Sequence, residues 1–204
     1  PRALQHLPGW RRLAPAPAWP AGEIAMPGVA AQPLPIEHLT AQAFAPFGDV
    51  IEAASARESY PINDGTAQRH HDITRVDCSA GDGHALVSIV TAQPRELPFD
   101  IVMLERHPLG SQAFMPLSPA LYLVVVAQSP GAMPHAFLAS QGQGINYHRG
   151  TWHHPLIALD DTADFLVVDR GGDGNNCDVA DLPTVYRLAR EALPAAMGAT
   201  TRQP

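Results

Sequence analysis

Short apolar segments, separated by turn-forming residues, run along most of this chain. From residue 86 onward the segments are rich in Val, Ile, Leu, Phe and Tyr, and they are separated by Gly, Pro, Ser and Asp. β-Branched and aromatic residues favour strands, and turns that recur at intervals of roughly 8–15 residues are typical of a β-sandwich or a closed barrel. The pattern therefore predicts a mainly β fold. The expected strands are Leu86–Thr91, Phe99–His107, Ala113–Met115, Leu121–Ala127, Ala136–Leu138, Ile145–His148, Leu156–Leu159 and Phe165–Asp169.

Helical signals occur only at the two ends of this β-rich region. Thr40 can cap a short N-terminal helix over residues 41–45, and a strand over Asp49–Glu52 follows. Apolar residues at helical spacing predict a C-terminal helix over Leu182–Met197, which Pro194 interrupts. The polar segment that contains residues 63–72 is expected to be a loop.

Residues 1–32 are expected to form a flexible N-terminal extension, because they are rich in proline and lack apolar periodicity. Residues 33–204 then form a single domain. The length of 204 residues is close to that of one domain, and a hydrophobic share of 46% supplies enough apolar surface for a core.

Charge and composition exclude several classes of function. The net charge of −7 works against binding to nucleic acid or to an anionic membrane surface. All thirteen basic residues are arginines, which excludes Schiff-base enzymes, pyridoxal-phosphate enzymes and Walker-type phosphate loops. Cys78 and Cys177 fit neither a disulfide framework nor a cysteine zinc site, as expected in the cytoplasm. The longest apolar run, Leu121–Ala127, is far shorter than the roughly 20 residues of a membrane helix.

The densest group of chemically active side chains lies between Tyr147 and Pro155, where His148, His153 and His154 fall within seven residues. Imidazole is the commonest metal ligand and the usual acid or base at neutral pH. The alternative is a hairpin whose histidines only form hydrogen bonds to nearby carbonyl groups.

Glu105 and His107 form a second candidate, with Gln112 five residues further on. Because side chains alternate along a strand, Glu105 and His107 share one face, and inside a barrel that face lines the cavity. The alternative is a solvent-exposed pair at the end of a strand.

Two further groups are weaker candidates. Arg69 and His71 lie in the segment RHHD, where a guanidinium could hold a small carboxylate. Asp169 and Arg170 lead into the segment NNCD (175–178), and a structural salt link between them is the simpler interpretation.

Six segments together resemble the ureidoglycolate lyase family, also called ureidoglycolate hydrolase. In chain order they are PFGDVIE (46–52), RHHD (69–72), ERHPLGSQAF (105–114), GINYHRGTWHHPL (144–156), DFLVVDRGG (164–172) and NNCD (175–178). The resemblance implies a cupin-like double-stranded β-helix barrel, found as a homodimer. It also implies cleavage of ureidoglycolate to glyoxylate and urea in allantoin and purine nitrogen catabolism.

The comparison with cupins extends to the metal site of that fold. Cupins place His-x-His and a glutamate on one strand and a later histidine in Pro-x-Gly-x-x-His. In this chain Glu105, His107 and Gln112 take the first places, and His153 takes the last. A neutral amide beside two histidines and a glutamate could still hold a divalent ion such as Ni, Zn or Mn, more weakly than three histidines would.

The resemblance implies the following roles in the reaction. His107 and His153 act with Glu105 at the substrate hydroxyl, as metal ligands or in direct proton transfer, and Gln112 orients the substrate. Protonation of the departing nitrogen is assigned to His148 or His154. The substrate-binding residues are Arg69, which holds the carboxylate, with Arg149 as the second candidate, and His71 and Tyr147.

Two other functions remain open. One is a non-catalytic cupin-like protein that binds a small acid, although a sensor of this kind usually carries a nucleic-acid-binding module, and this sequence has no basic patch or helix-turn-helix pattern. The other is a different metal-dependent cupin enzyme, such as an isomerase or a dioxygenase.

Overall fold

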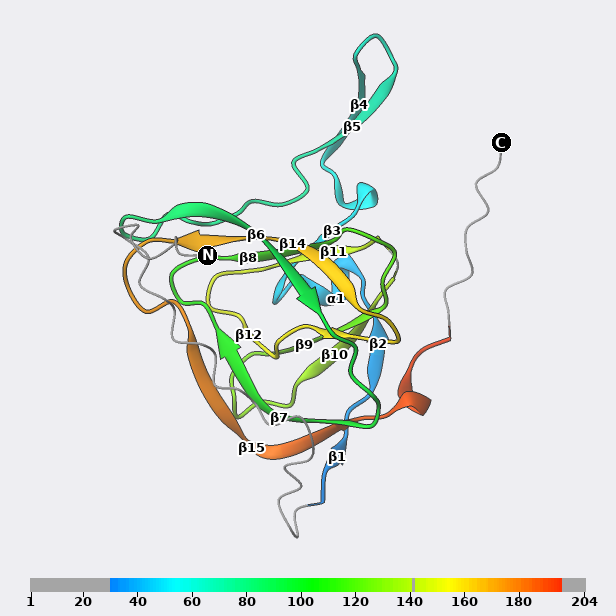
Figure 1. The fold of residues 1–204 in the computed structure, drawn as a ribbon, viewed down its shortest axis with the longest axis vertical. Helices are drawn as coiled ribbons and strands as arrows, with labels where there is room; N and C mark the ends of the chain where they lie inside the picture. Colours follow the sequence, from blue (N-terminus) through cyan, green and yellow to red (C-terminus); the bar gives the residue numbers. More distant parts are fainter. Residues whose placement is uncertain (1–29, 141, 196–204) are drawn as a thin grey trace, which may run out of the picture.

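Two curled β-sheets enclose one interior and form the body of the molecule (Figure 1). The computed structural model describes residues 30–140 and 142–195. The larger sheet has the strand order β1–β15–β7–β12–β9–β10–β2, and β13 also pairs with β9. Its strands are β1 (Gln32–Pro33), β2 (Ile36–His38), β7 (Phe99–Arg106), β9 (Tyr122–Ala127), β10 (His135–Ala139), β12 (Trp152–His153), β13 (Ile157–Ala158) and β15 (Asp178–Leu188).

The smaller sheet has the strand order β3–β11–β8–β14–β6. Its strands are β3 (Gly48–Ile51), β6 (His84–Ala92), β8 (Gln112–Pro116), β11 (Gly144–Tyr147) and β14 (Ala163–Gly171). From β6 onward the chain passes repeatedly from one sheet to the other, so that neighbouring strands come from distant parts of the sequence. This is a cupin-like β-barrel, and it confirms the predicted mainly β fold.

The interior between the two sheets is filled with large apolar side chains. Those contributed by both sheets include Phe114, Ile145, Phe165, Val124, Val126 and Phe137. A second apolar cluster, with Leu104, Leu123, Val125 and Leu188, lies on the other face of the larger sheet. Every residue of β9 is therefore buried, which explains the uninterrupted apolar run in its sequence.

The predicted N-terminal helix is present as α1 (Ala41–Phe44). The Thr40 side chain accepts a hydrogen bond from the backbone N–H of Ala43 at 3.2 Å, as an N-cap does. Phe44 is completely buried and packs edge-on against Phe137 at 5.9 Å between ring centroids. The helix thus anchors the beginning of the domain on the barrel core.

The predicted C-terminal helix is wrong over the residues that the structure describes. Residues 178–188 form β15, and a short 3-10 helix, η2 (Arg190–Ala192), follows. Tyr186 and Leu188 alternate inward and pair with Ile101 and Phe99 of β7. Pairing with β7 buries this segment at a spacing of two residues, and this outweighs the few apolar residues at helical spacing. Residues 196–197 of the predicted helix lie outside the described part.

The polar segment predicted to be a loop instead contains a β-hairpin. After the 3-10 turn η1 (Ala53–Ser55), strands β4 (Glu58–Ile62) and β5 (Ala67–His71) pair with each other and project away from the barrel (Figure 1). Asn63, Asp64 and Gly65 form the turn with positive φ angles of 52°, 53° and 85°. Asn, Asp and Gly adopt this conformation more readily than other residues, so the sequence Asn-Asp-Gly was the local feature that indicated a hairpin turn here.

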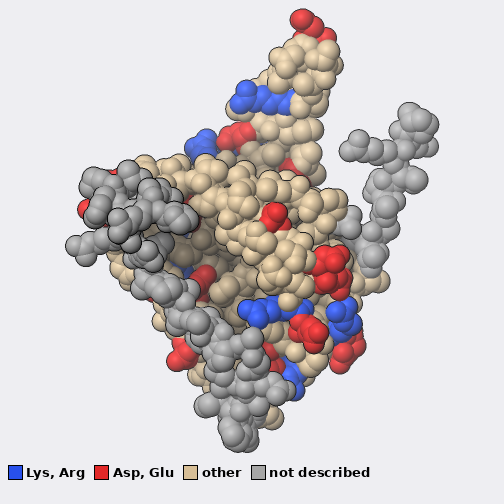
Figure 2. All heavy atoms as spheres, viewed as in Figure 1, with Lys and Arg blue, Asp and Glu red and all other residues tan. Residues whose placement is uncertain are grey.

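The surface turned to the viewer in Figure 2 is hollowed between the two sheets, and its acidic and basic groups are intermixed rather than gathered by sign. Among the described residues, no helix has the length and apolar character needed to cross a membrane. Residues 1–29 of the expected N-terminal extension lie outside the described part, whereas Gln32, assigned to the same extension, pairs with Tyr186 in the larger sheet.

Candidate active site

Glu105, His107 and His153 meet at one end of the barrel interior. Glu105 lies on β7, His107 directly follows that strand, and His153 lies on β12 in register with Glu105. The ligating atoms of the three side chains all lie within 4.8 Å of one another, and the two imidazole rings are 5.2 Å apart. Strand pairing thus brings His107 and His153 together, although they are 46 positions apart in the sequence.

Backbone carbonyl groups fix the tautomer of both histidines. His107 donates through Nδ1 to the Asn176 carbonyl oxygen at 2.6 Å, and His153 donates through Nδ1 to that of Thr151 at 2.9 Å. A carbonyl oxygen only accepts, so Nδ1 carries the hydrogen in each neutral ring and Nε2 carries a lone pair. Both Nε2 atoms are buried without a hydrogen-bond partner among the described residues, and that of His153 lies 3.6 Å from a Glu105 oxygen.

Burial shifts the pKa values of His153 and Glu105 in the directions that oppose an ion pair between them. Burial and the nearby His107 together lower the pKa of His153 to about 3, so its ring is neutral. Burial also raises the pKa of Glu105, an effect that the neighbouring His107 partly offsets. Two lone pairs and a carboxylate therefore face one centre, an arrangement suited to a shared proton or a divalent cation.

Tyr147 closes one side of the cluster. Its ring stacks on His153 at 4.0 Å between centroids and an angle of 14°. The residue is 2% exposed, and its hydroxyl has no hydrogen-bond partner among the described residues. Burial raises the pKa of this hydroxyl well above its ordinary value, so it keeps its proton and is available as a donor.

A row of polar side chains on the smaller sheet faces the cluster. Tyr147 on β11 pairs with Gln112 on β8, and the β8–β14 register of Ala113 with Val168 places Asp169 opposite Gln112. The Gln112 amide and His107 both lie close enough to the Asp169 carboxyl group to lower its pKa, but burial outweighs them and raises the pKa of Asp169. The site therefore has two walls, one from each sheet.

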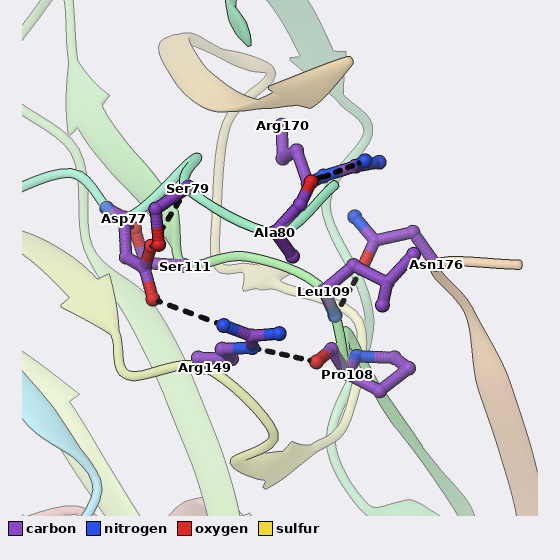
Figure 3. A network of polar contacts seen from close by, with 9 residues as sticks. All are labelled: Asp77, Ser79, Ala80, Pro108, Leu109, Ser111, Arg149, Arg170 and Asn176. Atoms are coloured by element: carbon purple, nitrogen blue, oxygen red, sulfur yellow. Dashed lines mark hydrogen bonds and ion pairs between the residues drawn. The ribbon is translucent and has the colours of Figure 1, made fainter. Parts of the chain in front are cut away.

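The turn between His107 and Gln112 is held from several directions (Figure 3). The hydrogen bonds are Arg149 Nε to Pro108 O (2.7 Å), Leu109 N to Asn176 Oδ1 (2.8 Å), Ser111 N to Asp77 O (2.9 Å) and Asp77 N to Ser111 Oγ (2.8 Å). Since both ends of the turn carry site residues, this network fixes the two walls relative to each other. Arg149, expected as a second substrate clamp, instead takes part in this support, and its Nη1 lies 3.7 Å from Asp77.

The other two histidines of the dense group lie away from the cluster. His148 is half-exposed on the outside, with Nε2 3.3 Å from Asp49. His154 follows His153 directly and packs edge-on against Phe99 at 5.5 Å. Adjacent side chains of a strand point to opposite faces, so only one of His153 and His154 can reach the barrel interior.

Arg69 and His71 lie on β5 of the projecting hairpin. Arg69 is exposed and pairs with Tyr60 in the hairpin register, and His71 packs against the ring of the same tyrosine. Within one copy of the chain, the structure does not bring either side chain to the cluster.

The predicted salt link between Asp169 and Arg170 is not formed. Arg170 lies on the face of β14 away from the barrel interior, where its buried side chain donates to the Ala80 carbonyl (Figure 3). Its Nη2 also lies 3.2 Å from Asp82 Oδ1. Asp169 follows Phe165 and Val167 at a spacing of two, and both of these face the interior. Strand alternation sends Asp169 into the site and Arg170 to the opposite face.

The segment after β14 also contributes groups whose roles the sequence did not reveal. Asn176 accepts from His107 through its backbone and from Leu109 through its side chain. Cys177 lies with Sγ 3.9 Å from a Glu105 oxygen at the edge of the site. The glycines and asparagines of this segment indicated a tight turn, but nothing local in the sequence indicated which strand end it would cover.

Two histidines, a partly buried glutamate and an amide thus meet at one end of a cupin-like barrel, as the few convergent polar groups of a small-molecule site do. The family model for ureidoglycolate lyase matches residues 31–189, and the chain belongs to this family. It is 52% identical to a ureidoglycolate lyase of Burkholderia mallei over 165 residues, which cover 79% of this chain and 96% of the relative. It is 51% identical to those of Burkholderia cepacia (171 residues, 81% and 94%) and Pseudomonas aeruginosa (150 residues, 71% and 88%).

Proposed function

We propose that this chain is a ureidoglycolate lyase, which cleaves ureidoglycolate to glyoxylate and urea in allantoin and purine nitrogen catabolism. The observation that carries the proposal is the partly buried cluster of Glu105, His107 and His153 in a chain of this family. The relatives at about half identity bear the name of the same enzyme.

The reaction needs little more than the movement of one proton. In ureidoglycolate a single carbon carries a hydroxyl, a carboxylate and the ureido nitrogen. When a base takes the hydroxyl proton, the oxygen forms a carbonyl with that carbon, the carbon–nitrogen bond breaks, and the departing nitrogen takes up a proton. The products are glyoxylate and urea, and no water is consumed.

The cluster supplies the groups for this step. The Nδ1 atoms of His107 and His153 are held by backbone carbonyl groups, which leaves the Nε2 atoms of both rings to face the substrate hydroxyl, with Glu105 beside them. The proton taken from the hydroxyl can be returned to the departing nitrogen, so that no external acid is required. The Tyr147 hydroxyl is a donor that has no partner among the residues the structure describes, and it is assigned to the bound substrate.

The same residues fit a divalent cation. Two imidazole lone pairs and a carboxylate, with Gln112 on the facing wall, are a donor set that borderline ions such as Ni, Zn or Mn accept. The carbonyl groups of Asn176 and Thr151 orient the two rings, as second-sphere groups do in metal sites. When bound, such an ion supplies a Lewis acid that polarises the hydroxyl and carboxylate oxygens.

The same polar residues weigh against the two other functions. A non-catalytic binder of a small acid has no need of two histidines whose Nε2 atoms lack a partner among the described residues and lie beside a carboxylate, whereas proton transfer uses such groups. A dioxygenase or isomerase of the cupin kind needs a stronger ligand set than one with an amide in the glutamate position.

We further infer that the protein acts as a homodimer through β6. This strand lies at the edge of the smaller sheet, and Val87 and Ile89 are 69% and 56% exposed on it. The nine residues of β6 include no Asp, Glu or Arg, although exposed edges are usually protected by charge. A second copy can extend the sheet by pairing its own β6 in antiparallel orientation, without charge repulsion.

This association gives Arg69 a role that it cannot have within one copy. The hairpin projects from its own barrel (Figure 1), and we propose that it delivers Arg69 and His71 to the substrate in the site of the second copy. Guanidinium is suited to the carboxylate of the substrate, and the chain has no lysine for this purpose.

The cytoplasm is the proposed location, because Cys78 and Cys177 are both free, as in a reducing compartment. The function itself is tested by incubating the purified protein with ureidoglycolate and following glyoxylate and urea. Equal amounts of both products, at a rate above the spontaneous decay of the substrate, support the proposal. Binding without turnover would assign the chain to the non-catalytic alternative.

A further inference from the structure

The polar wall on the smaller sheet includes an acidic side chain that the reaction as described does not use. Asp169 lies at the inner end of β14, beyond Phe165 and Val167, and its neighbour across the strands is Gln112. The roles proposed above for the other wall account for the hydroxyl and the reacting carbon of the substrate. They leave the ureido group without a binding partner.

The β8–β14 register places the Asp169 carboxyl group next to the Gln112 amide on the inner face of the sheet. Because carboxyl oxygens accept hydrogen bonds, this neighbour favours the orientation in which the amide NH₂ of Gln112 points toward Asp169. The Gln112 oxygen then points away from Asp169. Without this contact the amide could turn by half a rotation and present a donor instead.

The carboxylate itself has acceptor capacity left for a ligand. Its neighbour on the strand, Arg170, is occupied by Ala80 and Asp82 on the opposite face. Among the described residues no arginine forms an ion pair with Asp169. A carboxylate can accept several hydrogen bonds, and the Gln112 amide and the backbone N–H of Asp169 leave further acceptor positions free for a ligand.

We propose that Asp169 and Gln112 form the subsite that recognises the ureido group of the substrate. A ureido group presents N–H donors from both of its nitrogens, and this wall presents the acceptors that match them: the Gln112 oxygen and the Asp169 carboxylate. The facing wall, with Glu105, His107 and His153, takes the hydroxy-acid end. This inference rests on the proposed function, and it makes Asp169 a specificity-determining residue that acts on the substrate and through Gln112.

The subsite is tested with two stable ligands measured by calorimetry. Oxalurate joins a ureido group to a two-carbon acid, but it has a carbonyl in place of the hydroxyl-bearing carbon, so the lyase reaction cannot occur. Oxalate is the corresponding two-carbon acid without the ureido group. In Asp169→Asn we expect the affinity for oxalurate to fall by about 10-fold or more, because a charge-assisted hydrogen bond is lost and the Gln112 amide can turn, whereas oxalate binding changes less than about twofold. Gln112→Met should show the same selective loss.

Asp164→Asn is the matched control, because Asp164 lies on the same strand and bonds to Thr91 on the exposed side. With ureidoglycolate, Asp169→Asn should raise KM by more than it lowers kcat, which a general loss of folding would not do. Equal loss of both ligands, or no loss of either, in a variant with an unchanged melting temperature would overturn the subsite. If the wild-type protein binds oxalurate no better than oxalate, the subsite is also wrong. Absence of urea release by the wild-type protein would instead overturn the proposed function.

Discussion

His153 is the side chain with the most contacts at the centre of the site. It stacks on Tyr147, lies beside His107, faces Glu105 and is held by a backbone carbonyl. Its ring is neutral because burial lowers its pKa to about 3. At neutral pH this oriented imidazole therefore presents an unprotonated Nε2 as a ligand or proton acceptor.

We expect His153→Ala to lower kcat/KM by about 100-fold or more, because both the lone pair and the orientation of its neighbours are lost. Steady-state release of urea measures the effect. His38→Ala is the control, since His38 lies on β2 at the far edge of the larger sheet, and it should retain full activity. A fully active, folded His153→Ala protein would remove His153 from the mechanism.

For individual residues, the sequence predicted which residue types form the site, but not in every case which side chains point into the barrel interior. The spacing of Glu105 and His107 predicted a shared face, and the two side chains do meet. The choice between His153 and His154 depended on the register of β12 with β7, a long-range pairing that no local pattern encodes. The inward direction of Asp169 depended in the same way on the β8–β14 register.

Among the elements, β3 and β11 support the site from behind. Gly48 pairs with Tyr147, and a Cβ atom at Gly48 would lie 2.2 Å from the Asn146 carbonyl oxygen and 2.8 Å from the Phe44 ring. Only glycine lets helix α1 and the strand carrying Tyr147 approach this closely.

Gly48→Ala should therefore lower the free energy of unfolding by about 1–3 kcal/mol, because the backbone must shift to relieve the contact. Denaturant unfolding gives the value. Gly131→Ala is the matched control, since a Cβ atom there meets nothing within 4 Å, and it should change stability by less than about 0.5 kcal/mol. Equal stability of the two variants would show that the β3–β11 contact is softer than this structure indicates.

The elements that sequence patterns predicted were those with strong local signals. The strands from residue 86 to residue 169 have continuous or alternating apolar residues, and all of them are found. The exposed strands of the hairpin β4–β5 are polar, so hydrophobic alternation does not predict them. The sequence of β15 predicts a helix instead of a strand, because its burial depends on pairing with β7. Both elements owe their strand conformation to pairing partners rather than to periodicity.

For the whole molecule, the exposed edge at β6 leads to a prediction about association. Ile89→Arg should convert the protein from dimer to monomer, because two arginines would face each other across a pairing edge. Analytical ultracentrifugation distinguishes the two masses. A wild-type protein that is monomeric at all concentrations, or a variant that remains dimeric, would contradict an interface at β6.

Sharing of the site between copies is tested by mixing two variants. Arg69→Ala should raise KM by more than it lowers kcat, and His153→Ala should be nearly inactive. A hybrid dimer has one site with both groups intact, so random reassociation should restore about a quarter of wild-type activity at low substrate concentration. If the mixture is no more active than the sum of its parts, Arg69 does not act across the dimer.

We expect the carbon–nitrogen bond of ureidoglycolate to break by proton movement alone, and the nitrogen product shows whether it does. An amidohydrolase would instead attack the ureido carbonyl with an activated water and release ammonia and carbon dioxide. With ¹⁵N-labelled ureidoglycolate and a preparation shown to be free of urease, NMR should show all of the label in urea, formed in step with glyoxylate. Labelled ammonia appearing at the same rate as glyoxylate would contradict the account.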